Sequence, residues 1–322
     1  MSWKRKILNY KESSIYLRIV KILKTHSLPG FSRVPIYTIL KFINSELNKQ
    51  AIMVRANAIS FSLFLSLFPT ILVLFSLIAY FPIDKNFNLV IRDSILQVMP
   101  GNAGKMLYKT IIDVISKQRA DLLSLGFALA IFFSSNGMMS LMRGFDKSYP
   151  NTFRKLTGFQ KRVKAIVLTF MLGSIFFLSI VGLILGRIIF NFLFDLFNLS
   201  NFVAGFLDIM RWLLLIFVYY VGIAVIYRYG APLYRKLPII TAGATFATFT
   251  SICTSLVFSF YVENFSNYNK IYGSIGTFIV LMLWIQLNSL ILLIGFEINA
   301  AIAINKDIRK INAHVGEVSS KK

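Results

Sequence analysis

The sequence predicts an all-α polytopic membrane protein with six transmembrane helices and both termini in the cytoplasm. Three observations lead to this fold class. Of the 322 residues, 56% are hydrophobic and 15% are charged, whereas a soluble domain carries about a quarter charged residues. Six apolar stretches are each long enough to cross a hydrocarbon core of about 30 Å. Lysine and arginine are concentrated in alternate connections between these stretches, as the positive-inside rule describes.

Residues 1–57 are predicted to form a basic, amphipathic cytoplasmic lead. Hydrophobic residues recur at helical spacing over 15–23, and again over 36–47 after Pro35. This spacing predicts two amphipathic helices, which either lie on the anionic inner leaflet or pack against the cytoplasmic ends of the bundle. Because the lead lacks the apolar core of a cleaved signal peptide, we expect the first membrane helix to act as the insertion signal.

The membrane domain is predicted over residues 58–304, with spans at 58–81, 122–142, 165–186, 209–229, 239–261 and 272–305. Pro69 lies within the first span and cannot donate to the carbonyl of Leu65, which predicts a kink there. Asn57 and Ser66 precede this proline, and they favour either a binding-site lining or simple helix packing. Asn136 in the second span is predicted to bond a neighbouring helix.

The connections between spans have patterns of their own. Residues 82–121 predict two short amphipathic helices on the extracytoplasmic side, and 188–208 predict a smaller surface helix. Tyr227 to Pro232 is typical of an interfacial aromatic anchor before a turn. Residues 305–322 are predicted to form a basic cytoplasmic tail.

The sixth span contains the least expected residues of the chain. It has no charge from 275 to 294, yet it includes Gln286 and Asn288, and Glu297 follows. Glu297 lies about 33 Å along the helix from position 275, which places it near the inner membrane boundary. Gln286 and Glu297 share a helix face. This face either lines a substrate path with Glu297 at its cytoplasmic mouth, or Glu297 pairs structurally with a loop arginine such as Arg143 or Arg235.

The excess of positive charge is interpreted as a topology signal. Of the 35 lysines and arginines, 26 lie in residues 1–57, 143–164, 228–236 and 306–322, and nine lie in the other connections. This bias places both termini in the cytoplasm. It also predicts contact with the anionic headgroups of membrane lipids, and it gives no support for nucleic-acid binding. Homo-oligomerisation stays open.

Enzyme chemistry lacks its usual residues. The chain has one cysteine, Cys253, and two histidines, His26 and His314, which lie near the two ends of the sequence. No metal-ligand cluster, Walker A motif, dinucleotide-binding fingerprint or nucleophile elbow is present. We therefore expect no catalytic residue, no cofactor and no metal site.

Four stretches resemble a known family: 56–69 (ANAISFSLFLSLFP), 272–276 (YGSIG), Leu283-Trp284 and 295–300 (GFEINA). They are similar to the first helix and the closing signature of the YihY/BrkB family, and Tyr268 and residues 143–149 agree with the same pattern. The resemblance covers about residues 45–305 and implies a bacterial inner-membrane protein with six helices. Members have carried the label ribonuclease BN, but this sequence offers no nuclease site. The family has no firmly assigned activity.

The leading functional hypothesis is a transporter or a lipid-handling, flippase-like protein without an ATPase of its own. The polar face from Gln286 to Glu297, the first helix with Pro69 and the basic inner face favour it. The alternative is a membrane scaffold that organises partners or lipids without transport. A membrane-bound nuclease ranks third.

Overall fold

The computed structural model describes residues 51–78, 120–197, 201–264 and 274–320, together with scattered positions between 21 and 45 and between 92 and 112. The amphipathic helices predicted before residue 51 and between 82 and 119 lie outside the continuous ranges. Six long helices are present in these ranges: α4 (Ala51–Ile78), α7 (Ala120–Gly144), α8 (Gly158–Phe197), α9 (Asn201–Val225), α10 (Ala242–Asn264) and α12 (Ser274–Ser320).

Each of these helices contains a segment long and apolar enough to cross a membrane, which confirms the six predicted spans. The lipid environment explains why these apolar segments are helical. A chain in lipid has no water to bond its amides and carbonyls, so an apolar run must satisfy them within one helix. A π-helical turn, η1 (Ile226–Gly230), follows α9 directly.

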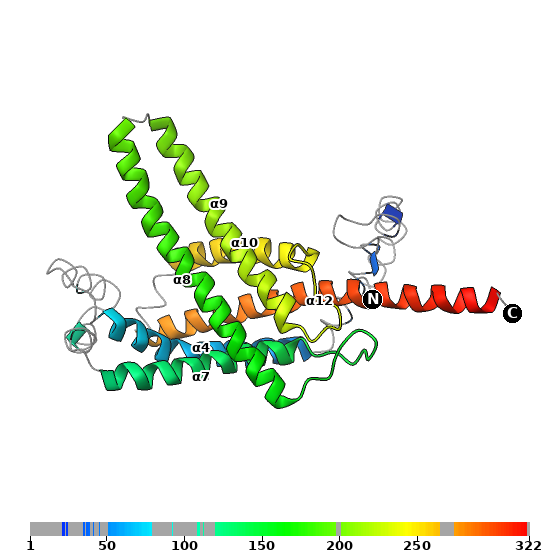
Figure 1. Cartoon of the computed structure of the whole chain (residues 1–322). Helices are drawn as coiled ribbons and strands as arrows, with labels where there is room; N and C mark the ends of the chain where they lie inside the picture. Colours follow the sequence, from blue (N-terminus) through cyan, green and yellow to red (C-terminus); the bar gives the residue numbers. More distant parts are fainter. Residues whose placement is uncertain are drawn as a thin grey trace, which may run out of the picture.

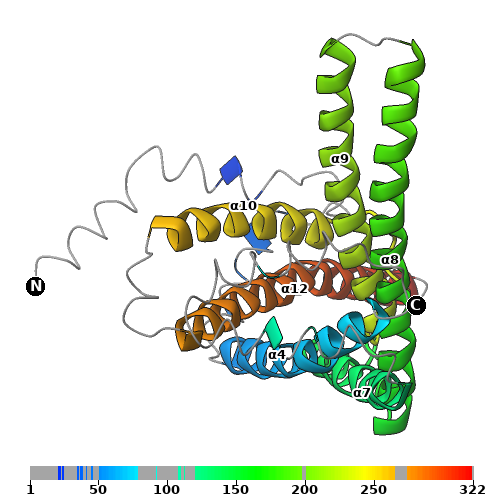
Figure 2. The ribbon, with the colours of Figure 1, turned by 90° about the vertical axis from the view of Figure 1, so that its left-hand side faces the viewer.

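The six helices pack as a closed ring. Around it, α4 contacts α7 and α12, α12 contacts α10, α10 contacts α9, α9 contacts α8, and α8 returns to α7. Figures 1 and 2 show α4, α7, α10 and α12 side by side, while α8 and α9 form a hairpin that is steeply inclined to them. The first and last described spans, α4 and α12, are therefore neighbours in space.

The α8–α9 hairpin corrects one expectation from the sequence. The surface helix predicted at 188–208 is absent as a separate element, because α8 continues to Phe197 and α9 begins at Asn201. Residues 188–197 contain no glycine or proline, so the helix has no cause to end at Arg187. Only 11% of each hairpin span is buried, against 28–33% for α4, α7 and α12, so the hairpin projects from the bundle.

The last helix, α12, has 47 residues and is about 70 Å long. A membrane core of about 30 Å accommodates less than half of that length. The segment predicted as a basic tail from 305 is thus a continuation of this helix to Ser320.

Aromatic side chains fill the core at one end of the ring. Phe296 of α12 stacks on Phe145 with ring centroids 4.1 Å apart. Tyr227 contacts both of these rings, and Phe153 contacts Phe296 edge-on. All four side chains are buried. We call this the Glu297 end, after the acidic residue beside Phe296.

Two connections are tied together at the Glu297 end. The amide of Arg154 donates to the Pro232 carbonyl at 2.7 Å, and the amide of Tyr234 donates to the Thr152 carbonyl at 3.1 Å. Phe153 and Leu233 form an antiparallel bridge between these bonds. The loops before α8 and before α10 are therefore held as one layer.

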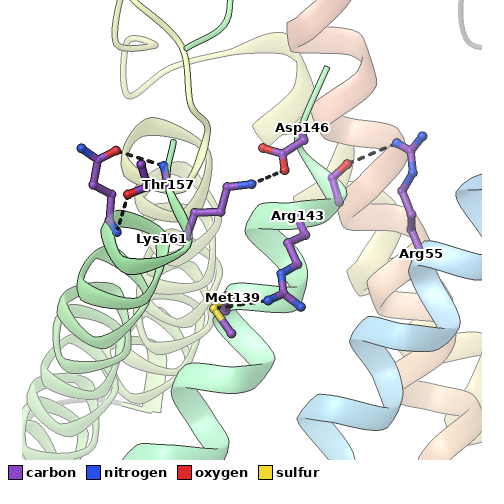
Figure 3. A network of polar contacts seen from close by, with 8 residues as sticks. Arg55, Met139, Arg143, Asp146, Thr157 and Lys161 are labelled. Carbon is purple, nitrogen blue, oxygen red and sulfur yellow. Dashed lines mark hydrogen bonds and ion pairs between the residues drawn. The ribbon is translucent and has the colours of Figure 1, made fainter. Parts of the chain in front are cut away.

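A capping box then starts α8. The Gln160 amide donates to the Thr157 hydroxyl at 3.3 Å, and the Thr157 amide donates to the Gln160 side-chain oxygen at 3.1 Å (Figure 3). This reciprocal pair satisfies two amides that the helix leaves without carbonyl partners.

The closest helix contact is between α10 and α12, at Gly243 and Gly295. A Cβ added to Gly295 would lie 2.7 Å from the carbonyl oxygen of Gly243 and 2.5 Å from the Tyr227 hydroxyl. Asn299 secures the crossing, because its Oδ1 accepts from the Gly243 amide at 2.9 Å and its amide nitrogen donates to Thr241 at 3.1 Å. Glycine is therefore required for the two backbones to approach this closely.

Candidate functional site

Glu297 forms a buried ion pair at the Glu297 end. Its side chain is 1% exposed, and Oε1 lies 2.6 Å from Nζ of Lys147, whose side chain is 6% exposed. Nη1 of Arg55 lies 3.8 Å from the same carboxylate oxygen. One carboxylate of α12 therefore faces cations from α4 and from the loop after α7. Removal of such charges from water is costly, and mutual pairing offsets that cost.

The end of α7 brings the two cations together. Its last residue, Gly144, packs closely, since a Cβ there would lie 2.8 Å from the Leu293 side chain. Nη1 of Arg55 donates to the Gly144 carbonyl at 3.3 Å, which Figure 3 shows as a contact from α4 to the end of α7. The chain then turns through Phe145, so Lys147 lies against α12.

The partners of Glu297 differ from the loop arginines considered above. Arg143 donates to the sulfur of Met139 at 3.9 Å, and Figure 3 shows its side chain directed back along α7. Arg235 lines a small cavity together with residues of the bridged loops and α12. Lys147 and Arg55 hold the carboxylate instead.

The polar residues in the middle of α12 contact other groups. Nε2 of Gln286 donates to Oδ1 of Asn57 at 2.7 Å, which links α12 to α4 at an exposed position. Asn288 donates to the Trp284 carbonyl at 2.9 Å on its own helix. Gln286 and Glu297 share a helix, but their side chains belong to separate contacts.

The remaining candidates lie in helix contacts of their own. The Ser66 hydroxyl donates to the Leu63 carbonyl at 2.6 Å, and α4 continues through Pro69 to Ile78. Asn136 accepts a hydrogen bond from Arg162, which joins α7 to α8. The structure thus brings together Glu297, Lys147 and Arg55, and it does not bring Asn57 or Asn136 to them.

A basic cavity opens beside the ion pair. It has a volume of about 960 Å³ and is lined by part of the segment 146–161 and by Tyr234. Four of its lining residues are cationic and one is acidic: Lys147, Arg154, Lys155, Lys161 and Asp146. Lys161 pairs with Asp146 (Figure 3), and the Arg154 guanidinium lies 5.2 Å from the Tyr234 ring centre. Lys147 belongs both to the wall of this cavity and to the buried pair.

Tyr234 also lines a smaller cavity of about 280 Å³. Arg235, Lys236 and Lys306 contribute positive charge to it, and its acidic residue, Asp307, accepts a hydrogen bond from Thr152 at 2.9 Å. Both cavities at the Glu297 end are therefore predominantly basic.

The burial of Tyr227 contradicts the prediction that this residue is part of an interfacial aromatic anchor. It is 1% exposed, and its hydroxyl donates to the Leu292 carbonyl at 2.7 Å. Its ring packs against Phe145 and Phe296. Its neighbour Tyr229 is the exposed member of the sequence YRY, so only that residue has the environment expected of an anchor.

The Tyr227→Phe substitution is expected to lower the free energy of unfolding by about 1–2 kcal/mol, because it removes a buried hydrogen bond between η1 and α12. Tyr229→Phe is the matched control and should change it by less than about 0.5 kcal/mol. Denaturant titration of the purified protein in detergent measures both. Equal changes would show that the Tyr227 hydroxyl contributes nothing specific.

In the described part of the chain, no group of three or more histidine, cysteine, aspartate or glutamate residues could hold a metal ion.

The sequence marks the members of the ion pair unequally. Glu297 stands out in the sequence as a carboxylate in an apolar run, whereas Lys147 and Arg55 lie in basic connections with no feature that marks them as its partners.

Several known proteins are similar to this chain over most of its length. The family described as "Virulence factor BrkB" matches residues 43–316. The ribonuclease-like protein YfkH of Bacillus subtilis is 28% identical over 260 residues, which cover 81% of this chain and 93% of the relative. A UPF0761 membrane protein of Histophilus somni is 24% identical over 287 residues (88% and 94%), and one of Haemophilus influenzae is 22% identical over 258 residues (80% and 90%). No solved structure matches the chain.

Proposed function

Because the chain belongs to the BrkB family of integral membrane proteins, we propose that it is a transporter or a lipid-handling, flippase-like protein without an ATPase of its own. The buried pair of Lys147 and Glu297 carries this proposal. Ionisable residues within membrane helices are costly, and they commonly mark the path of an ion or substrate. Here the pair lies beside a cavity that is open to solvent.

Glu297 has the geometry of a switchable contact. Lys147 and Arg55 approach the same carboxylate oxygen from different elements, at 2.6 and 3.8 Å. A substrate anion that draws Lys147 away leaves Arg55 of α4 beside the carboxylate, and the contact then shifts from the loop after α7 towards α4. Such an exchange provides two discrete arrangements between which a transporter alternates.

The proposal includes an orientation. We propose that the protein lies in the inner membrane of a bacterial cell with both termini in the cytoplasm, and the bias of lysine and arginine supports this orientation. The Glu297 end is then the cytoplasmic end, and its basic cavities face the inner leaflet. Anionic lipids are abundant there and attract such surfaces.

Reconstitution in liposomes tests the transport role. We expect Glu297→Gln to slow lipid scrambling or anion flux at least about tenfold, the size of effect that follows from about 1.4 kcal/mol. Asp307→Asn is the control, because it neutralises another carboxylate of α12 that bonds Thr152. If Glu297→Gln leaves the observed flux unchanged, the role given to Glu297 is wrong.

A scaffold is the second candidate, and the α8–α9 hairpin favours it. Only 11% of each hairpin span is buried, so its large apolar side chains, including Phe176, Phe177 and Trp212, are open to lipid or to a partner within the membrane. A scaffold predicts that Glu297→Gln alters assembly or stability without a transport defect. The proposal contains no enzymatic step, and RNA degradation by the pure protein in the presence of chelators would contradict that part of it.

A further inference from the structure

We propose that the basic cavity is a binding site for a phosphate-bearing anion, with Arg154 and Lys155 as the contacting cations and Lys147 as the link to Glu297. The chemistry recognised is the phosphate group, from either a lipid headgroup or free phosphate. The inference deepens the proposed function and rests on it only for the link to transport. The binding itself follows from the cavity.

The charge balance of the cavity calls for an anion. Its one acidic lining residue, Asp146, pairs with Lys161, and Lys147 pairs with Glu297. Within the described ranges, no carboxylate forms an ion pair with Arg154 or Lys155, both of which are exposed. Two cations therefore meet in one concave surface without a counter-charge.

The walls of the cavity are preorganised. The backbone of Arg154 is fixed by its bond to Pro232, and the Phe153–Leu233 bridge precedes it. The Arg154 guanidinium lies over the Tyr234 ring, which limits the conformations that its side chain adopts. A cation held in place in this way loses little entropy when it binds a ligand.

The size of the cavity and its donors fit a phosphate ester. A volume of about 960 Å³ exceeds what a single ion needs and accommodates a headgroup with its polar substituent. Arginine binds two phosphate oxygens at once, and lysine adds a point charge. Ser148 and Gln160 line the same cavity and supply neutral hydrogen-bond donors.

Lys147 connects occupancy of the cavity to the buried pair. Its ammonium group is 2.6 Å from Glu297, and the residue also lines the cavity. An anion in the cavity competes with Glu297 for this ammonium group. By reciprocity, removal of the Glu297 charge strengthens anion binding.

The test uses the full-length protein purified in detergent. Native mass spectrometry measures binding of phosphatidylglycerol, with phosphatidylcholine as the comparison lipid, and calorimetry measures binding of inorganic phosphate. The double variant Arg154→Gln/Lys155→Gln is compared with Arg235→Gln/Lys236→Gln, which removes two charges from the smaller cavity nearby. Elution volume and thermal midpoint verify that each variant is folded.

We expect phosphatidylglycerol to bind more tightly than phosphatidylcholine, and the Arg154/Lys155 variant to weaken its binding at least about tenfold. The Arg235/Lys236 variant should change binding by less than about threefold. If the Arg154/Lys155 variant also weakens the binding of inorganic phosphate, the phosphate group alone is sufficient for recognition. If it weakens the binding of phosphatidylglycerol but not of inorganic phosphate, the ligand is the lipid.

Equal losses in the two double variants, or no loss in the Arg154/Lys155 variant with either probe, would overturn the site. Glu297→Gln should tighten anion binding several-fold, and weaker binding in this variant would overturn the link through Lys147. None of these measurements requires transport. If the protein binds phosphatidylglycerol through Arg154 and Lys155 but transports no substrate, the proposed binding site stands and the proposed function is wrong.

Discussion

Replacement of Lys147 with methionine is expected to lower the free energy of unfolding by about 3–5 kcal/mol, the usual cost of removing one partner from a buried ion pair. Glu297 would remain almost fully buried, and it would lose the ammonium group that lies 2.6 Å from its carboxylate. Methionine retains most of the lysine side-chain volume, so the loss reports on charge more than on packing. Denaturant titration in detergent measures the change.

The double variant Lys147→Met/Glu297→Leu separates pairing from packing. It replaces both charges with apolar groups, which is often neutral or stabilising in a protein interior. We therefore expect it to recover most of the stability lost in Lys147→Met. Lys155→Met is the control, because it removes an exposed charge from the same cavity and should cost less than about 0.5 kcal/mol. If the double variant is no more stable than Lys147→Met, the pair is not what stabilises this end.

The six spans were predictable from the sequence because each depends only on a local run of apolar residues. The bounds were harder to predict. The third span is predicted to end at 186, just before Arg187, but no glycine or proline follows before Phe197 and the helix continues to that residue. Residues 305–320, part of the predicted basic tail, belong to the helix α12.

The candidate site was predictable only in part. A carboxylate in an apolar run is visible from sequence alone, and Glu297 was identified on that basis. Its partners depend on how the loop after α7 folds back, and Lys147 is 150 positions away with no local signal. Tyr227 shows the same limit, since its burial follows from the packing of Phe145 and Phe296 around it and cannot be read from the pattern YRY.

The second large effect is expected at the crossing of α10 and α12. Gly243→Ala should lower the free energy of unfolding by about 3 kcal/mol, at the upper end of the cost of overpacking. A Cβ at Gly243 would meet the Gly295 carbonyl and come within 2.6 Å of the Asn299 side chain, so it must push the helices apart. The Asn299 bonds to Gly243 and Thr241 would then lengthen together.

Gly173→Ala is the matched control, because it is the same substitution within a membrane helix but has no heavy atom within 4 Å of the added Cβ. Alanine is the better helix former by up to about 1 kcal/mol, so this variant should be neutral or more stable. Thermal unfolding in detergent, followed by size-exclusion fluorescence, compares the two. Because Asn299 and Glu297 are close on α12, Gly243→Ala should also disturb the ion pair. The double variant Gly243→Ala/Lys147→Met should therefore lose less stability than the sum of the losses in the two single variants. Equal stability of Gly243→Ala and Gly173→Ala would show that the two backbones do not approach as closely as Gly243 and Gly295 indicate.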